Sequence, residues 1–176
     1  MKWAIDWGAK VIITKRLELV PVHIKYSEEL FELWSDVDVI KYTNSNLVKT
    51  QEECDERLKV FIDHTNYDTP NNFIILLDNK SIGIIGFLSI SNEKQEWGFY
   101  YQLIKKYWGN GYANEAAFYI VKYIFQKYPE STLYADCVVN NFASISILKN
   151  LDFYQTHIEE NKFNNLDVAH FKLSKK

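Results

Sequence analysis

The chain has 176 residues, of which 47% are hydrophobic and 24% are charged, a balance that is typical of a folded globular protein and argues against disorder. Its 20 basic and 23 acidic residues give a net charge of −3, which argues against a general nucleic-acid-binding protein. Because only Arg16 and Arg57 are arginines, we expect any phosphate to be held by backbone amides and lysines.

Cys54 and Cys137 are the only cysteines, too few for a disulfide scaffold or a cysteine zinc site, and we predict no metal. The longest apolar stretches fall far short of the ~20 residues that a membrane-spanning helix needs. Residues 1–13 do not read as a signal peptide, because Asp6 and Lys10 interrupt them. We therefore expect a cytoplasmic protein, monomeric or homodimeric, that binds neither membrane nor nucleic acid.

The first half of the chain predicts one strand and two helices. Alternating apolar residues predict a strand over 14–20 that stops near Pro21. Ser27 can cap a short helix that runs through residue 34. Thr50 and Glu53 have the spacing of a capping box, which begins a helix that ends at about residue 64.

The second half predicts the remaining elements of a layered fold. Strands are expected over 72–77, 81–90, 95–103, 132–138, 153–159 and 168–173, and helices over 112–128 and 141–150. This order indicates an α/β fold with a mixed, mostly antiparallel sheet of six to seven strands and about four helices. No linker divides the chain, so we expect a single domain over 1–176, in which residues 1–13 form an additional segment with no assigned role.

The loop over 105–113 carries the strongest functional signal. Gly109 and Gly111 can adopt positive φ and let the backbone approach a ligand, and the helix amides after them form an anion site. No acidic residue lies between Glu96 and Glu115, so the local field is expected to be positive. The loop fits neither the Walker pattern nor the three-glycine Rossmann pattern. The alternative is a plain glycine turn before a helix.

The pattern Lys106-x-x-Gly109-x-Gly111-x-Ala113 resembles the (Gln/Arg)-x-x-Gly-x-Gly/Ala loop of the GNAT acetyltransferases, in particular their RimJ/RimL-like branch. The resemblance extends from about residue 14 to residue 173 and implies the GNAT fold and acetyl-CoA as cosubstrate. The residues that it assigns to acetyl-CoA binding are Leu103, Ile104, Lys106, Tyr107, Trp108, Gly109, Asn110, Gly111, Tyr112, Ala113, Asn141 and Ser144.

Residues 141–153 resemble a second family segment, N-x-x-S-x-x-x-L-x-x-x-G-F, with Asp152 in the place of the glycine. By this resemblance, Asn141 holds the pantetheine arm or orders the loop, and Ser144 donates a hydrogen bond to the departing thiolate. Leu148 stands where many members have a tyrosine general acid, which favours this role for Ser144. The alternative for Asn141 and Ser144 is helix capping.

The implied reaction is transfer of the acetyl group to a primary amine, which attacks the thioester directly in a ternary complex. The amine could belong to a protein N-terminus, a polyamine or an aminoglycoside-type molecule. In the family a splay between the fourth and fifth strands exposes a strand edge, here the backbone around Leu103 and Ile104. The alternative from another class is a non-catalytic acyl-CoA-binding sensor or assembly module.

Two carboxylates are candidates for the general base that deprotonates the amine. Glu96 enters the strand before the glycine loop, and Glu160 lies near the start of the final hairpin. The alternative for each is a solvated surface carboxylate. His157 and His170 lie on strands, where a histidine is more often a packing or edge residue.

Overall fold

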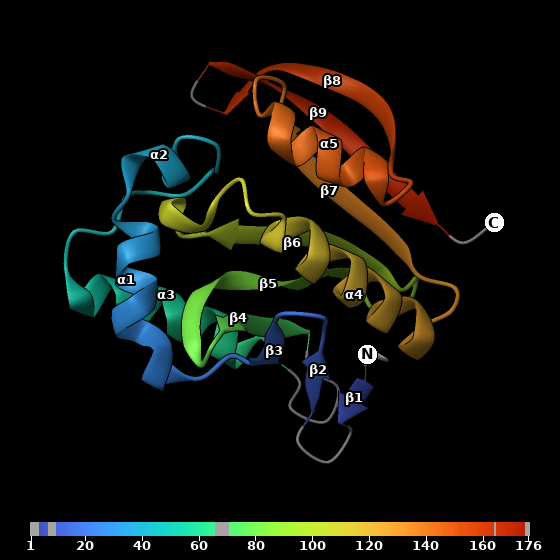
Figure 1. The fold of residues 1–176 in the computed structure, drawn as a ribbon. Coiled ribbons are helices and arrows are strands. Elements are labelled where there is room, and N and C mark those ends of the chain that lie inside the picture. The colour runs from blue at the N-terminus through green and yellow to red at the C-terminus, as the bar shows by residue number, and fades with distance from the viewer. Residues whose placement is uncertain (1–3, 7–9, 66–70, 164, 175–176) are drawn as a thin grey trace.

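The computed structural model describes residues 4–6, 10–65, 71–163 and 165–174. One nine-stranded sheet runs through these residues in the order β1-β2-β3-β4-β5-β6-β7-β9-β8 (Figure 1). The strands are β1 (Ala4–Asp6), β2 (Val11–Ile13), β3 (Glu18–Pro21), β4 (Asn72–Leu77), β5 (Lys80–Ser91), β6 (Glu96–Leu103), β7 (Thr132–Val138), β8 (Tyr154–Phe163) and β9 (Leu166–Ser174). The helices are α1 (Ser27–Trp34), α2 (Val37–Ile40), α3 (Gln51–Asp63), α4 (Tyr112–Lys127) and α5 (Phe142–Asn150), with 3-10 turns η1 (Ile24–Tyr26) and η2 (Lys105–Tyr107).

The sheet is antiparallel except at one junction. The β6 and β7 strands run parallel and pair only at Glu96↔Thr132, Trp97↔Leu133 and Gly98↔Tyr134. Both strands continue beyond this point, β6 to residue 103 and β7 to residue 138, without further pairing between them. The sheet therefore splays open between β6 and β7, as the resemblance implies.

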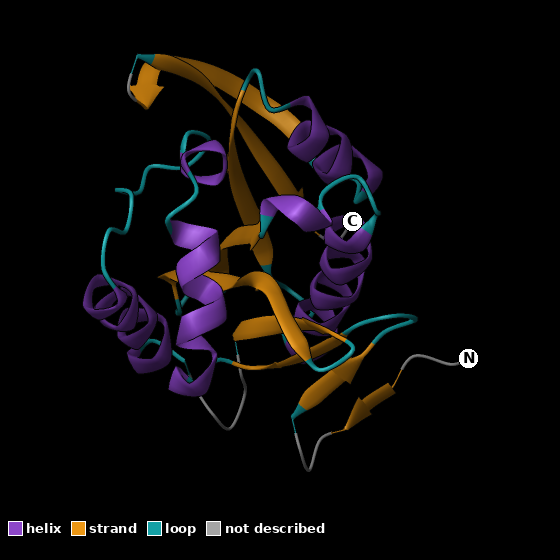
Figure 2. Ribbon diagram, turned by 60° about the vertical axis from the view of Figure 1, so that its left-hand side comes forward, coloured by secondary structure: helices purple, strands orange, loops and turns teal. Residues whose placement is uncertain are grey.

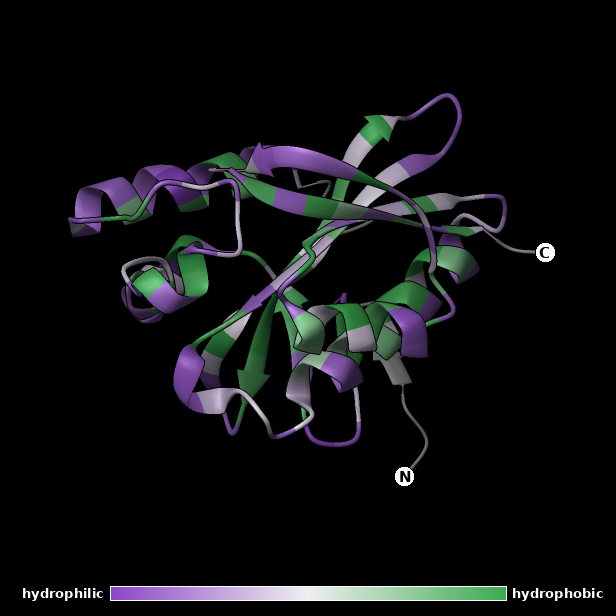
Figure 3. Ribbon diagram, turned by 90° about the horizontal axis from the view of Figure 1, so that it is seen from above, coloured by the Kyte–Doolittle hydropathy of each residue, from purple (hydrophilic) through white to green (hydrophobic). Residues whose placement is uncertain are grey.

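Helices cover both faces of the sheet and create two apolar cores (Figure 2). The α4 and α5 side holds the larger core, which includes Phe87, Ile120 and Phe171. The α1 to α3 side holds a second core around Trp34 and Leu58. Figure 3 shows helices with both hydrophilic and hydrophobic bands, as expected where one face of a helix packs on a sheet. No helix in the described ranges is long and apolar enough to cross a bilayer.

The predicted α/β fold is confirmed, but the strand and helix counts were too low. The three-residue strands β1 and β2 and the four-residue helix α2 are too short to show a periodicity. Of the additional segment 1–13, residues 1–3 and 7–9 lie outside the described residues, and the rest lengthens the sheet at its edge.

The start of the first predicted strand was wrong. Residues 14–17 form a turn between β2 and β3, closed by hydrogen bonds between Thr14 and Leu17. The backbone N–H of Thr14 donates to Leu17 O at 2.9 Å, and the Thr14 hydroxyl accepts from Leu17 N at 2.8 Å. A threonine hydroxyl can close such a turn, although its alternating neighbours suggested an extended strand.

Candidate active site

The loop between β6 and α4 presents an uncapped helix N-terminus. Gly109 and Gly111 have φ of 76° and 79°, in the left-handed region that disfavours a side chain. No side chain caps α4, so its first amides have no partner within the helix. A Cβ on Gly109 would meet nothing within 4 Å. Free amides at the positive end of a helix dipole form a site for an anion such as phosphate.

Arg16 lies against this loop. Its Nη1 donates to Asn110 O at 3.1 Å, and its guanidinium lies 4.6 Å from the ring centroid of Tyr112. Its Nη2 would be 3.5 Å from a Cβ on Gly111. Lysines were expected beside this loop, and Arg16 was missed because the two segments are 94 residues apart and no local pattern connects them.

The two lysines of the loop are instead paired with carboxylates from α1 and α2. Lys106 Nζ lies 2.8 Å from Glu32 Oε2, and Lys105 forms an ion pair with Asp38. The hydrogen bond from Lys105, followed by that from Lys41, lowers the pKa of Asp38 to about 2. The positive field expected from the lysines is therefore largely neutralised by these acids.

After the last pair with β7, Gly98↔Tyr134, β6 has an unpaired backbone edge that faces β7. Ile104 N donates to Ile82 O at 2.9 Å, so the even-numbered residues of this segment bond to β5. The alternation leaves the carbonyl of Phe99 and the amide and carbonyl of Tyr101 facing the gap, while Leu103 O accepts from Trp108 Nε1 at 2.8 Å. The open-edge role expected for Ile104 is therefore wrong, because its amide is already used by β5.

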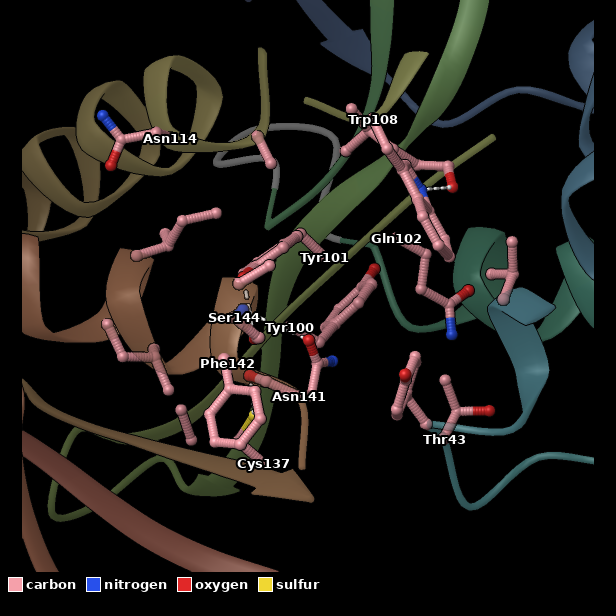
Figure 4. A pocket seen from close by; sticks show the side chains of 18 of the residues that line it. Thr43, Tyr100, Tyr101, Gln102, Trp108, Asn114, Cys137, Asn141, Phe142 and Ser144 are labelled. Carbon is pink, nitrogen blue, oxygen red and sulfur yellow. Dashed lines mark hydrogen bonds between the residues drawn. The ribbon is translucent and has the colours of Figure 1, made fainter. Parts of the chain in front are cut away.

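Ser144 lies at the other side of the gap, in the first turn of α5. Asn141 caps α5, and its side chain accepts a hydrogen bond from Ser144 N at 3.2 Å. The Ser144 hydroxyl lies 2.8 Å from the Tyr101 hydroxyl (Figure 4). Burial raises the pKa of Tyr101 far above its usual value, although the hydrogen bond with Ser144 opposes this shift. Tyr101 therefore remains a proton donor at any ordinary pH.

One cavity of about 700 Å³ joins these parts. Its lining runs from the glycine loop and the start of α4, past the open edge of β6, to Cys137, Asn141 and Ser144. At the far end it reaches Val39 and the segment 42–44 that follows α2; Figure 4 shows Thr43 facing the gap from the side opposite Ser144. The cavity thus extends from the uncapped helix N-terminus to a second end beside residues 42–44.

The structure brings most of the predicted binding residues to this cavity. The lining includes Leu103, Tyr107, Trp108, Gly109, Gly111, Tyr112, Ala113, Asn141 and Ser144 but not Ile104, Lys106 or Asn110. Tyr100 and Tyr101 both line it. The Tyr100 hydroxyl, however, donates to Asn72 Oδ1 at 2.7 Å, so its proton is already used.

The two carboxylates predicted as bases lie elsewhere. Glu96 accepts a hydrogen bond from the Tyr134 hydroxyl at 3.2 Å and does not line the cavity. Glu160 is exposed on β8 and does not line it either. The acidic residue in the lining is Asp136, on β7, which sequence reasoning missed because nothing in its neighbourhood marks it as different from a strand surface residue.

Comparison with known proteins supports the same interpretation. Residues 16–154 match the family described as the acetyltransferase (GNAT) domain. The chain is 27% identical over 173 residues to the uncharacterized N-acetyltransferase p20 of Bacillus licheniformis, covering 95% of this chain and 97% of that protein.

Solved structures share the fold. A GNAT-family acetyltransferase from Bacillus anthracis has a TM-score of 0.81 at 22% identity, over 93% of this chain and 98% of that one. RimL, a ribosomal L7/L12 alpha-N-protein acetyltransferase in complex with coenzyme A, has a TM-score of 0.84 at 16% identity, over 93% of this chain and 97% of that one.

Proposed function

This chain belongs to the GNAT acetyltransferase family, and we propose that it is an N-acetyltransferase that transfers the acetyl group of acetyl-CoA to a primary amine in a ternary complex. One observation carries the proposal. A single cavity connects the uncapped N-terminus of α4, the open edge of β6 and the hydroxyl of Ser144. We interpret these as a phosphate site, a site for extended amides and a proton donor.

The chain's own groups fit acetyl-CoA. The amides that follow Gly111 suit the pyrophosphate, and the absence of a side chain at Gly109 leaves room for close approach. The free carbonyl of Phe99 and the free amide and carbonyl of Tyr101 suit the amides of the pantetheine arm, which would add to β6 as a short strand. When bound, acetyl-CoA supplies the activated acetyl thioester.

We assign to Ser144 the stabilisation of the sulfur that leaves the thioester. The Ser144 hydroxyl can receive a hydrogen bond from Tyr101 and direct its own proton into the cavity. Asn141 fixes the turn that positions it, and the Nδ2 of Asn141 has no hydrogen bond within the described ranges and so remains available to a ligand carbonyl. The capping role and the binding role of Asn141 are therefore compatible.

The acceptor would bind at the second end of the cavity, beside Val39 and residues 42–44. A protein N-terminus, a polyamine and an aminoglycoside-type molecule all present a primary amine. A structural neighbour is a ribosomal L7/L12 alpha-N-protein acetyltransferase, which makes a protein N-terminus a natural first acceptor to test.

The experiment is thiol release from acetyl-CoA in the presence of an N-terminal peptide, spermidine or kanamycin. Acetyl-CoA should also raise the melting temperature, because a ligand that binds only the folded state stabilises it. Acetate alone should not. A raised melting temperature without thiol release for any amine would indicate the non-catalytic binding module instead, and no shift at all would overturn the cosubstrate.

A further inference from the structure

A cluster of two histidines and two carboxylates lies on β7, β9 and β8, outside the predicted site. His170 Nδ1 lies 2.8 Å from Asp136 Oδ1, and its Nε2 lies 3.4 Å from Glu159 Oε2. The rings of His157 and His170 are stacked, with centroids 4.3 Å apart and planes 5° apart. The His170 side chain is only 18% exposed, whereas both carboxylates that it contacts are partly exposed.

Asp136 connects this cluster to the cavity. It pairs across the sheet with His170 and is 47% exposed, and it lines the cavity next to Cys137. The register of Gly98↔Tyr134, continued by two residues, puts Asp136 opposite Tyr100 across the splay. Because side chains alternate along a strand, Tyr101 and Cys137 lie on one face of the sheet, and Tyr100 and Asp136 lie on the other.

The two faces of the sheet therefore present different side chains at the gap between β6 and β7. Tyr101 and Ser144 lie on the face covered by α4 and α5, together with the glycine loop. Tyr100 packs against Phe61 of α3 and shares its core with Val39, which lines the second end of the cavity. Asp136, on the same face of the sheet as Tyr100, is the acidic residue in that lining.

We propose that Asp136 is the group that binds the protonated acceptor amine and takes its proton, and that His170 is a positioning residue that holds the carboxylate. The assignment rests on the proposed function. His170 contacts Oδ1, and Oδ2 has no hydrogen-bond partner among the described residues. A carboxylate near a cationic amine both attracts it and can accept a proton from it.

The proton balance is complete without a further reactant. The ammonium group transfers one proton to Asp136, and the free amine then forms the C–N bond while the C–S bond of the thioester breaks. The second proton of the amine ends on the departing sulfur, whose charge Ser144 and Tyr101 stabilise. Asp136 returns its proton to solvent, to which it is exposed, so one proton is released in each turnover.

Other charged groups face the cluster and bear on any pH dependence. His157 and Glu159 approach His170 from β8, and Lys162 forms an ion pair with Glu159 at 3.0 Å. The hydrogen bond from Lys162 is the largest cause of the lowered pKa of Glu159, so that carboxylate is charged at neutral pH. On β9, Lys172 lies over the ring of Tyr134, two residues from Asp136 along β7.

The test is Asp136→Asn, measured with the acceptor that the wild type uses in the thiol-release assay. We expect kcat/KM for the amine to fall by about 100-fold at neutral pH, the scale of general base catalysis. The loss should shrink as pH rises, because solvent then supplies the unprotonated amine. The affinity for acetyl-CoA should stay within about twofold, since Asp136 is on the acceptor face. Asp152→Asn removes an exposed carboxylate at φ 64°, which asparagine tolerates, and is the control.

His170 is tested with two substitutions. His170→Phe should lower kcat and raise the acceptor KM without changing acetyl-CoA affinity, and His170→Gln, which can donate to Oδ1, should recover part of the loss. A pH–rate profile of Asp136→Asn that superimposes on the wild type, or a loss carried by Glu96→Gln or Glu160→Gln instead, would overturn the assignment. Failure of the wild type to release thiol with any amine would overturn the proposed function, and the assignment with it.

Discussion

Arg16 Nε donates a 2.7 Å hydrogen bond to Oε2 of Glu115, in the first turn of α4. The backbone N–H of Arg16 and the hydroxyl of Thr14 donate to the other oxygen, each at 2.7 Å. A carboxylate near a helix N-terminus competes with a bound phosphate for the same positive field. Arg16 neutralises this competitor and also supports the loop through Asn110 O, so the β2–β3 turn stabilises the proposed phosphate site from outside.

Arg16→Gln should weaken acetyl-CoA binding. The substitution uncovers the charge of Glu115 beside the pyrophosphate, so we expect KM for acetyl-CoA to rise about tenfold, or ~1.4 kcal/mol, with kcat nearly unchanged. The double variant Arg16→Gln/Glu115→Gln should recover part of that loss. Arg57→Gln, which removes the arginine on Trp34, is the control for a lost guanidinium. A double variant no better than the single one would contradict the electrostatic explanation.

Glu115 should also affect how the free energy of unfolding changes as the pH falls into the acid range. Burial alone would raise its pKa, but hydrogen bonds from Thr14 and Arg16 outweigh burial and lower it. A carboxyl with a lowered folded pKa adds stability above its unfolded pKa of about 4.3, and that stability disappears as pH falls through the folded pKa. Glu115→Gln should cost about 1–2 kcal/mol at neutral pH and flatten the acid loss, measured by urea unfolding at several pH values. Equal acid slopes for the two proteins would contradict this.

Gly111 offers a test of the anion site itself. Any side chain there pays for φ of 79°, so Gly111→Gln and Gly111→Glu should lose similar stability, about 1–2 kcal/mol. They differ in charge. Gly111→Glu places a carboxylate beside the free amides of α4 and should abolish the rise in melting temperature caused by acetyl-CoA. Gly111→Gln should retain more of it. If both variants lost the rise in melting temperature equally, the size of the side chain, and not its charge, would be what prevents acetyl-CoA from binding.

Much of the fold and part of the site could be predicted because their causes are local. Three features depend only on residues that are close together in the chain. They are the cap of Thr50 on Glu53 N, the cap of Asn141 on Ser144 N, and the positive φ of the two loop glycines. The turn between β4 and β5 is equally local, with Asp78 and Asn79 at φ of 49° and 64°.

The features that could not be predicted depend on which segments, far apart in the sequence, come into contact in the fold. Nothing near Lys106 indicates that Glu32, 74 residues earlier, neutralises it. The same holds for Arg16 and Glu115, 99 residues apart. Asp136 becomes a cavity residue only because β6 and β7 separate after Gly98↔Tyr134, a property of the sheet and not of β7. The charge pattern along the chain therefore predicts a positive loop where the folded protein has paired ions.

Ser144 and Tyr101 should act as one unit in the chemical step. Ser144→Ala should lower kcat by about 10- to 100-fold and leave acetyl-CoA affinity within about twofold, because the hydroxyl is used only as the sulfur departs. Tyr101→Phe removes the donor behind Ser144 and should cause a smaller loss. If the two hydroxyls form one chain, the double variant should lose less than the product of the single losses. Equal losses in kcat and affinity for Ser144→Ala would contradict the leaving-group role.

Gly86 on β5 should be required for packing beside the cavity. A Cβ there would lie 2.3 Å from Asn71 O and 2.7 Å from Asn72 Oδ1, the atom that accepts the hydrogen bond from Tyr100. Gly86→Ala should therefore cost about 2–3 kcal/mol of unfolding free energy and displace Tyr100 from the gap. Gly98→Ala, where the nearest atom would be 3.8 Å away, is the control in the same sheet and should change stability far less. Urea unfolding measures both, and similar losses at the two positions would show that the strands yield to the added methyl group.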